Sequence, residues 1–119
     1  MPRPRIIFIN RVYWPSTAAT AQLLTDLAES LAARHWPVEV IAAGDGASER
    51  GGVKIHRTGG SELHRGFLSR IGNYRRFRAA AQRRVAEIAR PGDIVVVMTD
   101  PPLLGTAVAS AAQAQGAAV

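Results

Sequence analysis

The chain has 119 residues, of which 47% are apolar and 20% charged, a balance typical of one globular domain and not of a disordered chain. Cysteine is absent, which excludes a disulfide framework, a thiolate metal site and a cysteine nucleophile. The formal net charge is +6, and no apolar run approaches the roughly 18 residues that span a bilayer. The run Ile6–Ile9 is too short for a signal sequence, so we expect a cytoplasmic protein.

The N-terminal half of the chain predicts three strands and one helix. Residues 5–10 form a β-branched and aromatic run that is typical of a buried strand. Ser16 and Thr17 are candidate N-caps for a helix over 18–35. Six apolar residues of this helix recur at helical spacing and are expected to face the core: Leu23, Leu24, Leu27, Ala28, Leu31 and Ala32. Strands follow over 38–43 and 53–57, the second with one solvent-exposed face.

The C-terminal half predicts a long helix, a strand and a second helix. An apolar stripe stepping by three or four residues favours a helix within 61–90: Phe67, Ile71, Tyr74, Phe77, Ala81, Val85 and Ile88. Glycines weaken its start, so we expect its C-terminal part to pack on a sheet and Leu63–Phe77 to be available to a partner. Ile94–Met98 predicts a central parallel strand covered on both faces. A helix over 103–115 ends at Gly116, and 117–119 begins another strand.

This order of elements predicts an α/β fold, a Rossmann-like parallel sheet with helices on both faces. Ligands of such sheets bind at the carboxyl ends of the strands, where segments 10–17, 43–46 and 99–102 would meet. The first of these segments lacks the glycines of a dinucleotide site, and the chain has no GxxxxGK[ST] phosphate loop. We therefore expect neither NAD nor FAD.

Two features of these segments suit a polar ligand. The predicted helix start offers backbone N–H groups and the hydroxyls of Ser16, Thr17 and Thr20 to an anion, although an ordinary capped helix is the alternative. Asp100 follows the most apolar strand and precedes two prolines that fix its loop. It is suited to bind a sugar hydroxyl or act as a base, and the alternative is a cap of the next helix. The three histidines lack metal-ligand spacing, so no metal is expected.

The positive charge is concentrated in one segment. Residues 54–90 contain ten basic and two acidic residues, a formal charge of +8, whereas the rest of the chain carries −2. A basic amphipathic helix with aromatic residues can lie on an anionic membrane, for which the candidates are Arg65, Phe67, Arg70, Arg75, Arg76 and Arg78. A phosphorylated ligand, nucleic acid, and a solvated helix face in an arginine-rich chain are the alternatives, and no motif that reads nucleic-acid sequence is present.

Four stretches of the chain resemble the N-terminal domain of GT-B glycosyltransferases of the family 4 type: residues 5–15, 20–28, 38–41 and 95–105. The last stretch resembles a subgroup that builds surface polysaccharides. The resemblance implies a retaining hexosyltransferase without a metal or other cofactor, in which two Rossmann-like domains face a cleft. The N-terminal domain would bind the acceptor, for which the candidates are Arg11, Tyr13, Ser16, Thr17, Thr20 and Asp100, and the C-terminal domain would bind the nucleotide sugar.

The resemblance also implies a location and a partner domain. Many members act on lipid-linked acceptors at the inner face of the cell membrane, which suits the +8 segment and predicts peripheral association. The family's E-x7-E motif lies in the second domain, so we expect residues 1–119 to be an incomplete acceptor-binding domain that is inactive alone. Ala18 and Ala19 stand where the family's first loop often has glycine. The competing hypothesis is a non-enzymatic α/β module that binds anionic lipid or nucleic acid through residues 61–90.

Overall fold

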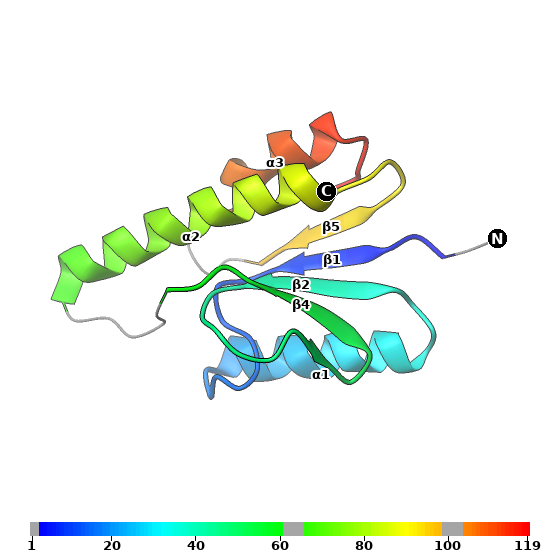
Figure 1. Cartoon of the computed structure of the whole chain (residues 1–119), viewed down its shortest axis with the longest axis horizontal. Helices are drawn as coiled ribbons and strands as arrows, with labels where there is room; N and C mark the ends of the chain where they lie inside the picture. Colours follow the sequence, from blue (N-terminus) through cyan, green and yellow to red (C-terminus); the bar gives the residue numbers. More distant parts are fainter. Residues whose placement is uncertain (1–2, 61–65, 99–103) are drawn as a thin grey trace.

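The computed structural model describes residues 3–60, 66–98 and 104–119, with side chains at all of these except 66–68. It has an α/β fold (Figure 1). In chain order the elements are β1 (Ile6–Ile9), α1 (Ala19–Ala33), β2 (Val38–Ala42), β3 (Glu49–Arg50), β4 (Val53–Arg57), α2 (Gly66–Ile88), β5 (Ile94–Val97) and α3 (Leu104–Ala114).

The described residues form a sheet of five strands in the order β3-β4-β2-β1-β5. The strands β4, β2, β1 and β5 are parallel, as predicted, but β3 pairs antiparallel with β4, so the expectation of a purely parallel sheet is wrong. The cause is a two-residue hairpin turn at Gly51 and Gly52, whose φ angles of 58° and 80° suit the left-handed positions of such a turn.

The strand β5 is not central, which corrects a second expectation. It lies at the end of the strand order, and Ile94 forms an isolated parallel bridge with Ala118 on its other side. Of the strand expected at 117–119, the described residues therefore form only this single bridge. Among the described strands, β1 is the one in which every residue is buried, because it lies between β2 and β5 and is covered by helices on both faces.

Helices cover both faces of the sheet, as predicted (Figure 1). Alternate residues of each strand point to opposite faces. Ile6 and Phe8 therefore pack on the α1 side, whereas Ile7 and Ile9 contribute to a second core shared with α2 and α3. Because β4, β2, β1 and β5 are parallel, their carboxyl ends lie at one end of the sheet.

The buried face of α1 differs in part from the predicted one. Leu23 is 70% exposed and Leu27 48% exposed, whereas the helix buries Ala21, Leu24, Thr25 and Ala28. Small residues at this stripe let the helix lie close to the sheet, and the Thr25 hydroxyl is satisfied because it donates to the Ala21 carbonyl at 2.7 Å. The predicted face is therefore correct for Leu24, Ala28, Leu31 and Ala32, which pack in the α1-side core, and wrong for Leu23 and Leu27.

The long helix α2 packs on the sheet with its C-terminal half and projects beyond it with its N-terminal half (Figure 1). Ala81 and Val85 are fully buried and Ile88 is partly buried, which confirms the predicted packing. Phe77 is also part of the core, so the segment expected to be available to a partner does not extend to it. The helix continues through Gly72 without a break.

Candidate functional site

Two adjoining cavities lie at the carboxyl ends of β1, β2 and β4, where the fold class predicts a ligand. They share the residues Arg11, Ala43 and Gly60. The first, which we call the cationic cavity, has a volume of about 290 Å³ and lies against α2. The second, the mixed cavity, has a volume of about 390 Å³ and lies against the loop between β1 and α1.

Three of the described arginines line the cationic cavity: Arg11, Arg76 and Arg83. Thr58, Gly59 and Gly60 at the end of β4 and Asn73, Phe77, Ala79 and Ala80 of α2 complete its described lining with Ala43. Among the described residues, no aspartate or glutamate lines this cavity. Its lining therefore carries a local excess of positive charge that favours an anionic group.

The position of Arg11 is fixed by both its backbone and its side chain. Its carbonyl accepts a hydrogen bond of 3.0 Å from the Ala43 N–H, which ties the end of β1 to the end of β2. Its guanidinium lies over the ring of Tyr74, 5.4 Å from the centroid, and the residue is only 8% exposed. Asn10, just before it, is buried and donates from Nδ2 to the Val12 carbonyl at 2.8 Å.

Glycines bring the ends of β2 and β4 together. Gly44 and Gly59 exchange two backbone hydrogen bonds of 2.9 and 3.0 Å. Gly59 and Gly60 have φ angles of 78° and 81°, a left-handed conformation that residues with a side chain rarely adopt. The sequence can take this turn because both positions lack a Cβ, and the turn places Gly60 between the two cavities.

The mixed cavity combines arginines with a carboxylate. Asp45 and Arg57 line it together with Arg11, Tyr13 and Ser16, among others. Arg57 donates to the backbone carbonyls of Trp14 and Ala43, so it connects the loop after β1 to the end of β2. A carboxylate accepts hydrogen bonds and a guanidinium donates them, so this lining can bind a ligand rich in hydroxyl groups.

The predicted acceptor residues have different positions. Arg11, Tyr13 and Ser16 line the mixed cavity, whereas Thr17 and Thr20 are exposed and line neither cavity. Asp100 lies outside the described residues.

Tyr13 is a buried wall of the mixed cavity, because its side chain packs in the α1-side core and is 2% exposed. Burial raises the pKa of its hydroxyl to about 12. This phenol is therefore neutral at physiological pH.

The helix start is organised differently from the prediction. The N-cap of α1 is Ala18, without a side-chain capping bond, so neither Ser16 nor Thr17 is the N-cap. Ser16 still contributes, because its hydroxyl oxygen accepts from the Ala18 N–H at 3.2 Å. The Gln22 side chain donates to the Thr17 carbonyl at 2.9 Å and holds the loop against the first turn.

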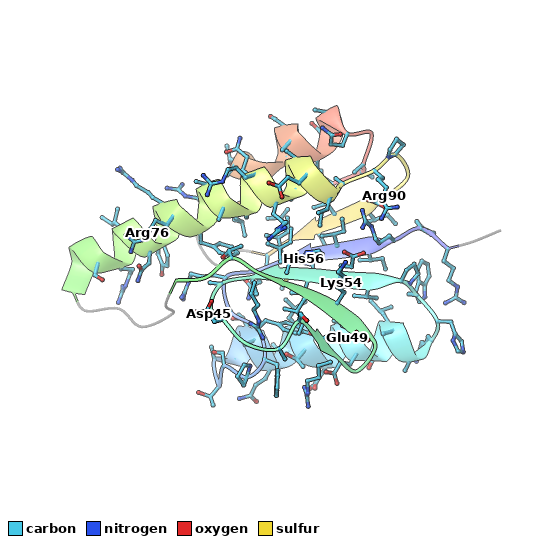
Figure 2. All side chains as sticks on the ribbon, in the orientation of Figure 1. Asp45, Glu49, Lys54, His56, Arg76 and Arg90 are labelled. Atoms are coloured by element: carbon cyan, nitrogen blue, oxygen red, sulfur yellow. The ribbon has the colours of Figure 1, made fainter. Side chains whose placement is uncertain are left out.

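The predicted membrane-facing residues lie along α2. Arg70, Arg75 and Arg76 are exposed and Arg78 is half-buried. Arg65 and the side chain of Phe67 lie outside the described residues. Figure 2 shows Arg76 on the part of α2 that projects past the sheet.

Sequence reasoning did not single out Asp45, Gly60 or Arg83 as site residues. Asp45 is the first carboxylate after β2, in a segment that the strand order had already placed at the carboxyl edge. Its position shortly after β2 could therefore have identified Asp45 as a candidate site residue. Arg83 flanks the predicted apolar stripe of Ala81 and Val85, but that stripe does not show which flanking arginines lie beside the end of β4.

At the opposite end of the sheet, where the parallel strands begin, lies a network of paired charges that the sequence analysis did not predict. Arg5 forms an ion pair with Glu39 at 2.9 Å and another with Asp93, and His56 Nε2 lies 2.6 Å from Glu39 Oε1. Arg5 also donates to the Ile88 carbonyl near the end of α2. These groups are nearly buried, with side-chain exposures of 8–15%.

This network shifts the pKa of two of its members. Hydrogen bonding to Asp93, helped by Glu39, raises the pKa of Arg5 despite its burial. Burial opposes ionisation of Glu39, but the hydrogen bonds from His56 and Arg5 outweigh it and lower the pKa of that carboxyl. Because its charged groups are paired with one another, the network serves the fold and offers little to a ligand.

Within the described part of the chain, no group of three or more histidine, aspartate or glutamate side chains is placed to hold a metal ion. In the same residues, no helix combines the length and hydrophobicity needed to cross a membrane.

Comparisons with protein-family models, curated proteins and solved structures found no significant match to this chain. Its function is therefore argued from the geometry above and from the sequence resemblance.

Proposed function

We propose that this chain is the acceptor-binding N-terminal domain of a glycosyltransferase that moves a sugar from a nucleotide sugar to an acceptor hydroxyl. The observation that carries the proposal is the pair of adjoining cavities at the carboxyl ends of β1, β2 and β4. This is the edge at which α/β sheets bind ligands, and a concave polar site there suits a small polar ligand. The resemblance of residues 5–15 and 95–105 to the family 4 type adds the reaction class.

The mixed cavity suits a saccharide. The carboxylate of Asp45 can accept hydrogen bonds from sugar hydroxyls, and the Ser16 hydroxyl can both donate and accept. Tyr13 keeps one wall of the cavity apolar and rigid because its ring is part of the core. In the proposed enzyme a second domain supplies the nucleotide-sugar site, so residues 1–119 alone are expected to have no transferase activity.

The proposal also includes a lipid-linked acceptor and peripheral contact with the inner face of the cell membrane. The N-terminal half of α2 projects past the sheet (Figure 1) and includes the exposed arginines Arg70 and Arg75, which can contact an anionic surface. The C-terminal half contributes its apolar residues to the core, so the proposed membrane contact lies on the projecting half.

Saccharide binding tests the proposal directly. Saturation-transfer difference NMR with a panel of neutral mono- and disaccharides is expected to detect binding to the wild-type chain. Asp45→Asn is expected to reduce the signal several-fold, because it removes the carboxylate that accepts hydroxyl hydrogen bonds. Asp26→Asn is the matched control, because Asp26 is an exposed residue of α1.

Three outcomes contradict the proposal: the chain binds no saccharide, Asp45→Asn binds as well as the wild type, or the purified chain alone transfers sugar. The competing hypothesis of a non-enzymatic module is tested by sedimentation with vesicles. Binding that needs anionic lipid and falls in the Arg70→Gln/Arg75→Gln variant supports membrane contact, whereas equal binding to duplex DNA at physiological salt indicates nonspecific electrostatics.

A further inference from the structure

We propose that the acceptor carries a phosphate group and that the cationic cavity binds it, while the attached sugar occupies the mixed cavity. This inference rests on the proposed function and adds the chemical class of the substrate. It follows from the difference between two cavities that share a wall: one has arginines without a described acidic residue, and the other adds the carboxylate of Asp45.

The first step of the argument is the arrangement of the arginines. Arg76 and Arg83 are seven residues apart, so they lie two turns apart on the same side of α2. Arg11 reaches the cavity from the end of β1, on the sheet side. Three guanidinium groups from two elements therefore border one space, and guanidinium is the side chain best suited to phosphate oxygens.

The second step concerns the pairing of the two α2 arginines. Arg76 donates to the Asn73 side-chain oxygen, a neutral partner. Within the described residues, no carboxylate lies within ion-pair distance of Arg76 or Arg83. Arg5, at the other end of the sheet, differs from them, since it has two carboxylate partners.

The third step is the open boundary between the cavities. Gly60 borders both of them, and among the described residues other than its chain neighbours no atom lies within 4 Å of the position where a Cβ would stand. One ligand can therefore extend from the mixed cavity into the cationic cavity past this glycine. A volume of about 290 Å³ is ample for a phosphate group, and the neighbouring 390 Å³ is sufficient for a sugar ring.

Isothermal titration calorimetry on the 119-residue chain at 150 mM salt tests the inference with four probes. Inorganic phosphate and glucose 1-phosphate are expected to bind, and glucose 1-phosphate is expected to bind at least tenfold more tightly than glucose, as a charged hydrogen bond implies. Octyl glucosyl phosphate, used as a monomer, distinguishes the sources of the phosphate: tighter binding than glucose 1-phosphate indicates a lipid-linked acceptor, and equal binding a soluble sugar phosphate. Either result is compatible with the inference.

Single substitutions on α2 locate the site. Arg76→Gln and Arg83→Gln are each expected to weaken the binding of glucose 1-phosphate and inorganic phosphate about three- to tenfold. Arg75→Gln is the matched control, because it removes the same charge from the same helix at a residue that lines neither cavity. Asp45→Asn is expected to weaken the binding of glucose 1-phosphate and leave that of inorganic phosphate unchanged.

Two results overturn the inference. If glucose 1-phosphate binds no more tightly than glucose, the phosphate site is contradicted and the proposed saccharide site is unaffected. An equal loss in Arg75→Gln and Arg83→Gln shows diffuse electrostatic attraction instead of a defined cavity. A different result separates the inference from the proposed function. If Arg83→Gln weakens phosphate binding but Asp45→Asn leaves the binding of glucose 1-phosphate unchanged, the anion site stands and the proposed saccharide site is contradicted.

Discussion

The two ends of the sheet differ in whether their arginines are paired with carboxylates. At the amino end, Arg5 lies between Glu39 and Asp93, and His56 joins them through Glu39. At the carboxyl end, Arg76 and Arg83 border a cavity that no described acidic residue lines. Figure 2 shows the two ends, with Arg90 near the first and Asp45 and Arg76 near the second.

This difference separates charges that hold the fold together from charges that are available to a ligand. A buried ion must be paired, since an unpaired one costs several kcal/mol. The amino end therefore contains charges of both signs in direct contact. An exposed arginine such as Arg76 or Arg83 remains hydrated and needs no partner for the chain to fold, so their excess of positive charge at the carboxyl end is available for recognition of an anion.

The largest effect is expected from Arg5→Ala. It leaves the nearly buried carboxylates of Glu39 and Asp93 without their cation and removes a donor to the Ile88 carbonyl. We expect the free energy of unfolding to fall by about 3 kcal/mol, measured by urea denaturation followed by circular dichroism. Arg90→Ala, at an exposed arginine near the same end, should cost less than about 0.5 kcal/mol. A loss below about 1 kcal/mol in Arg5→Ala would show that the network does not stabilise the fold.

Glu39→Gln should lower stability by about 2 kcal/mol at pH 7, and its effect should depend on pH. The pKa of Glu39 in the folded chain is below its ordinary value of 4.5, so its ionised form stabilises the fold above that pH. This contribution disappears as the pH falls through the lowered pKa. Urea midpoints between pH 7 and pH 3 should therefore decline less steeply in Glu39→Gln than in the wild type, and parallel curves would contradict the assignment.

Tyr13→Phe tests whether the wall of the mixed cavity is sealed from water. The pKa of Tyr13 is about 12 in the folded chain against 10.0 for an ordinary tyrosine, so the unfolded chain ionises first as the pH rises. The wild type should lose roughly 1 kcal/mol by pH 11 relative to Tyr13→Phe. Thermal unfolding at pH 8 and pH 11 measures this difference, and the same loss in both chains would place the hydroxyl in solvent.

The smallest effect on stability is expected at the carboxyl end. Arg76→Gln and Arg83→Gln remove exposed charges that have no described carboxylate partner, so each should change the free energy of unfolding by less than about 0.5 kcal/mol. At low salt the change should be slightly stabilising, because like charges on α2 repel one another. A loss above about 1 kcal/mol in either variant would assign these arginines to the fold.

Local patterns were sufficient to predict most of the elements. The strands over 5–10, 38–43 and 53–57 are confirmed within one or two residues because their β-branched runs are bounded by loop residues. The turn at Gly116 is also confirmed, with a φ of 80° and the Ala117 N–H bonded to the Ala112 carbonyl. The hairpin at Gly51 was missed because a strand of two residues has no periodicity.

The site was predicted less completely than the fold. Arg11, Tyr13 and Ser16 were identified because the strand order places the end of β1 at the ligand-binding edge. The buried network could not be predicted, since its members come from segments distant in sequence and meet only when β1, β2 and β4 pair in the observed register. Arg83 likewise joins the site only because α2 passes beside the end of β4, which the apolar stripe of the helix does not show.

The central claim is that the carboxyl end binds a sugar phosphate across two cavities. The most direct measurement is the two-dimensional ¹H–¹⁵N NMR spectrum of the chain titrated with glucose 1-phosphate. We expect the largest shifts at Gly44, Asp45, Gly59 and Gly60, with no change at Gly92 near the amino end. Shifts spread over the exposed arginines of the whole chain, or concentrated at Gly92, would contradict the account.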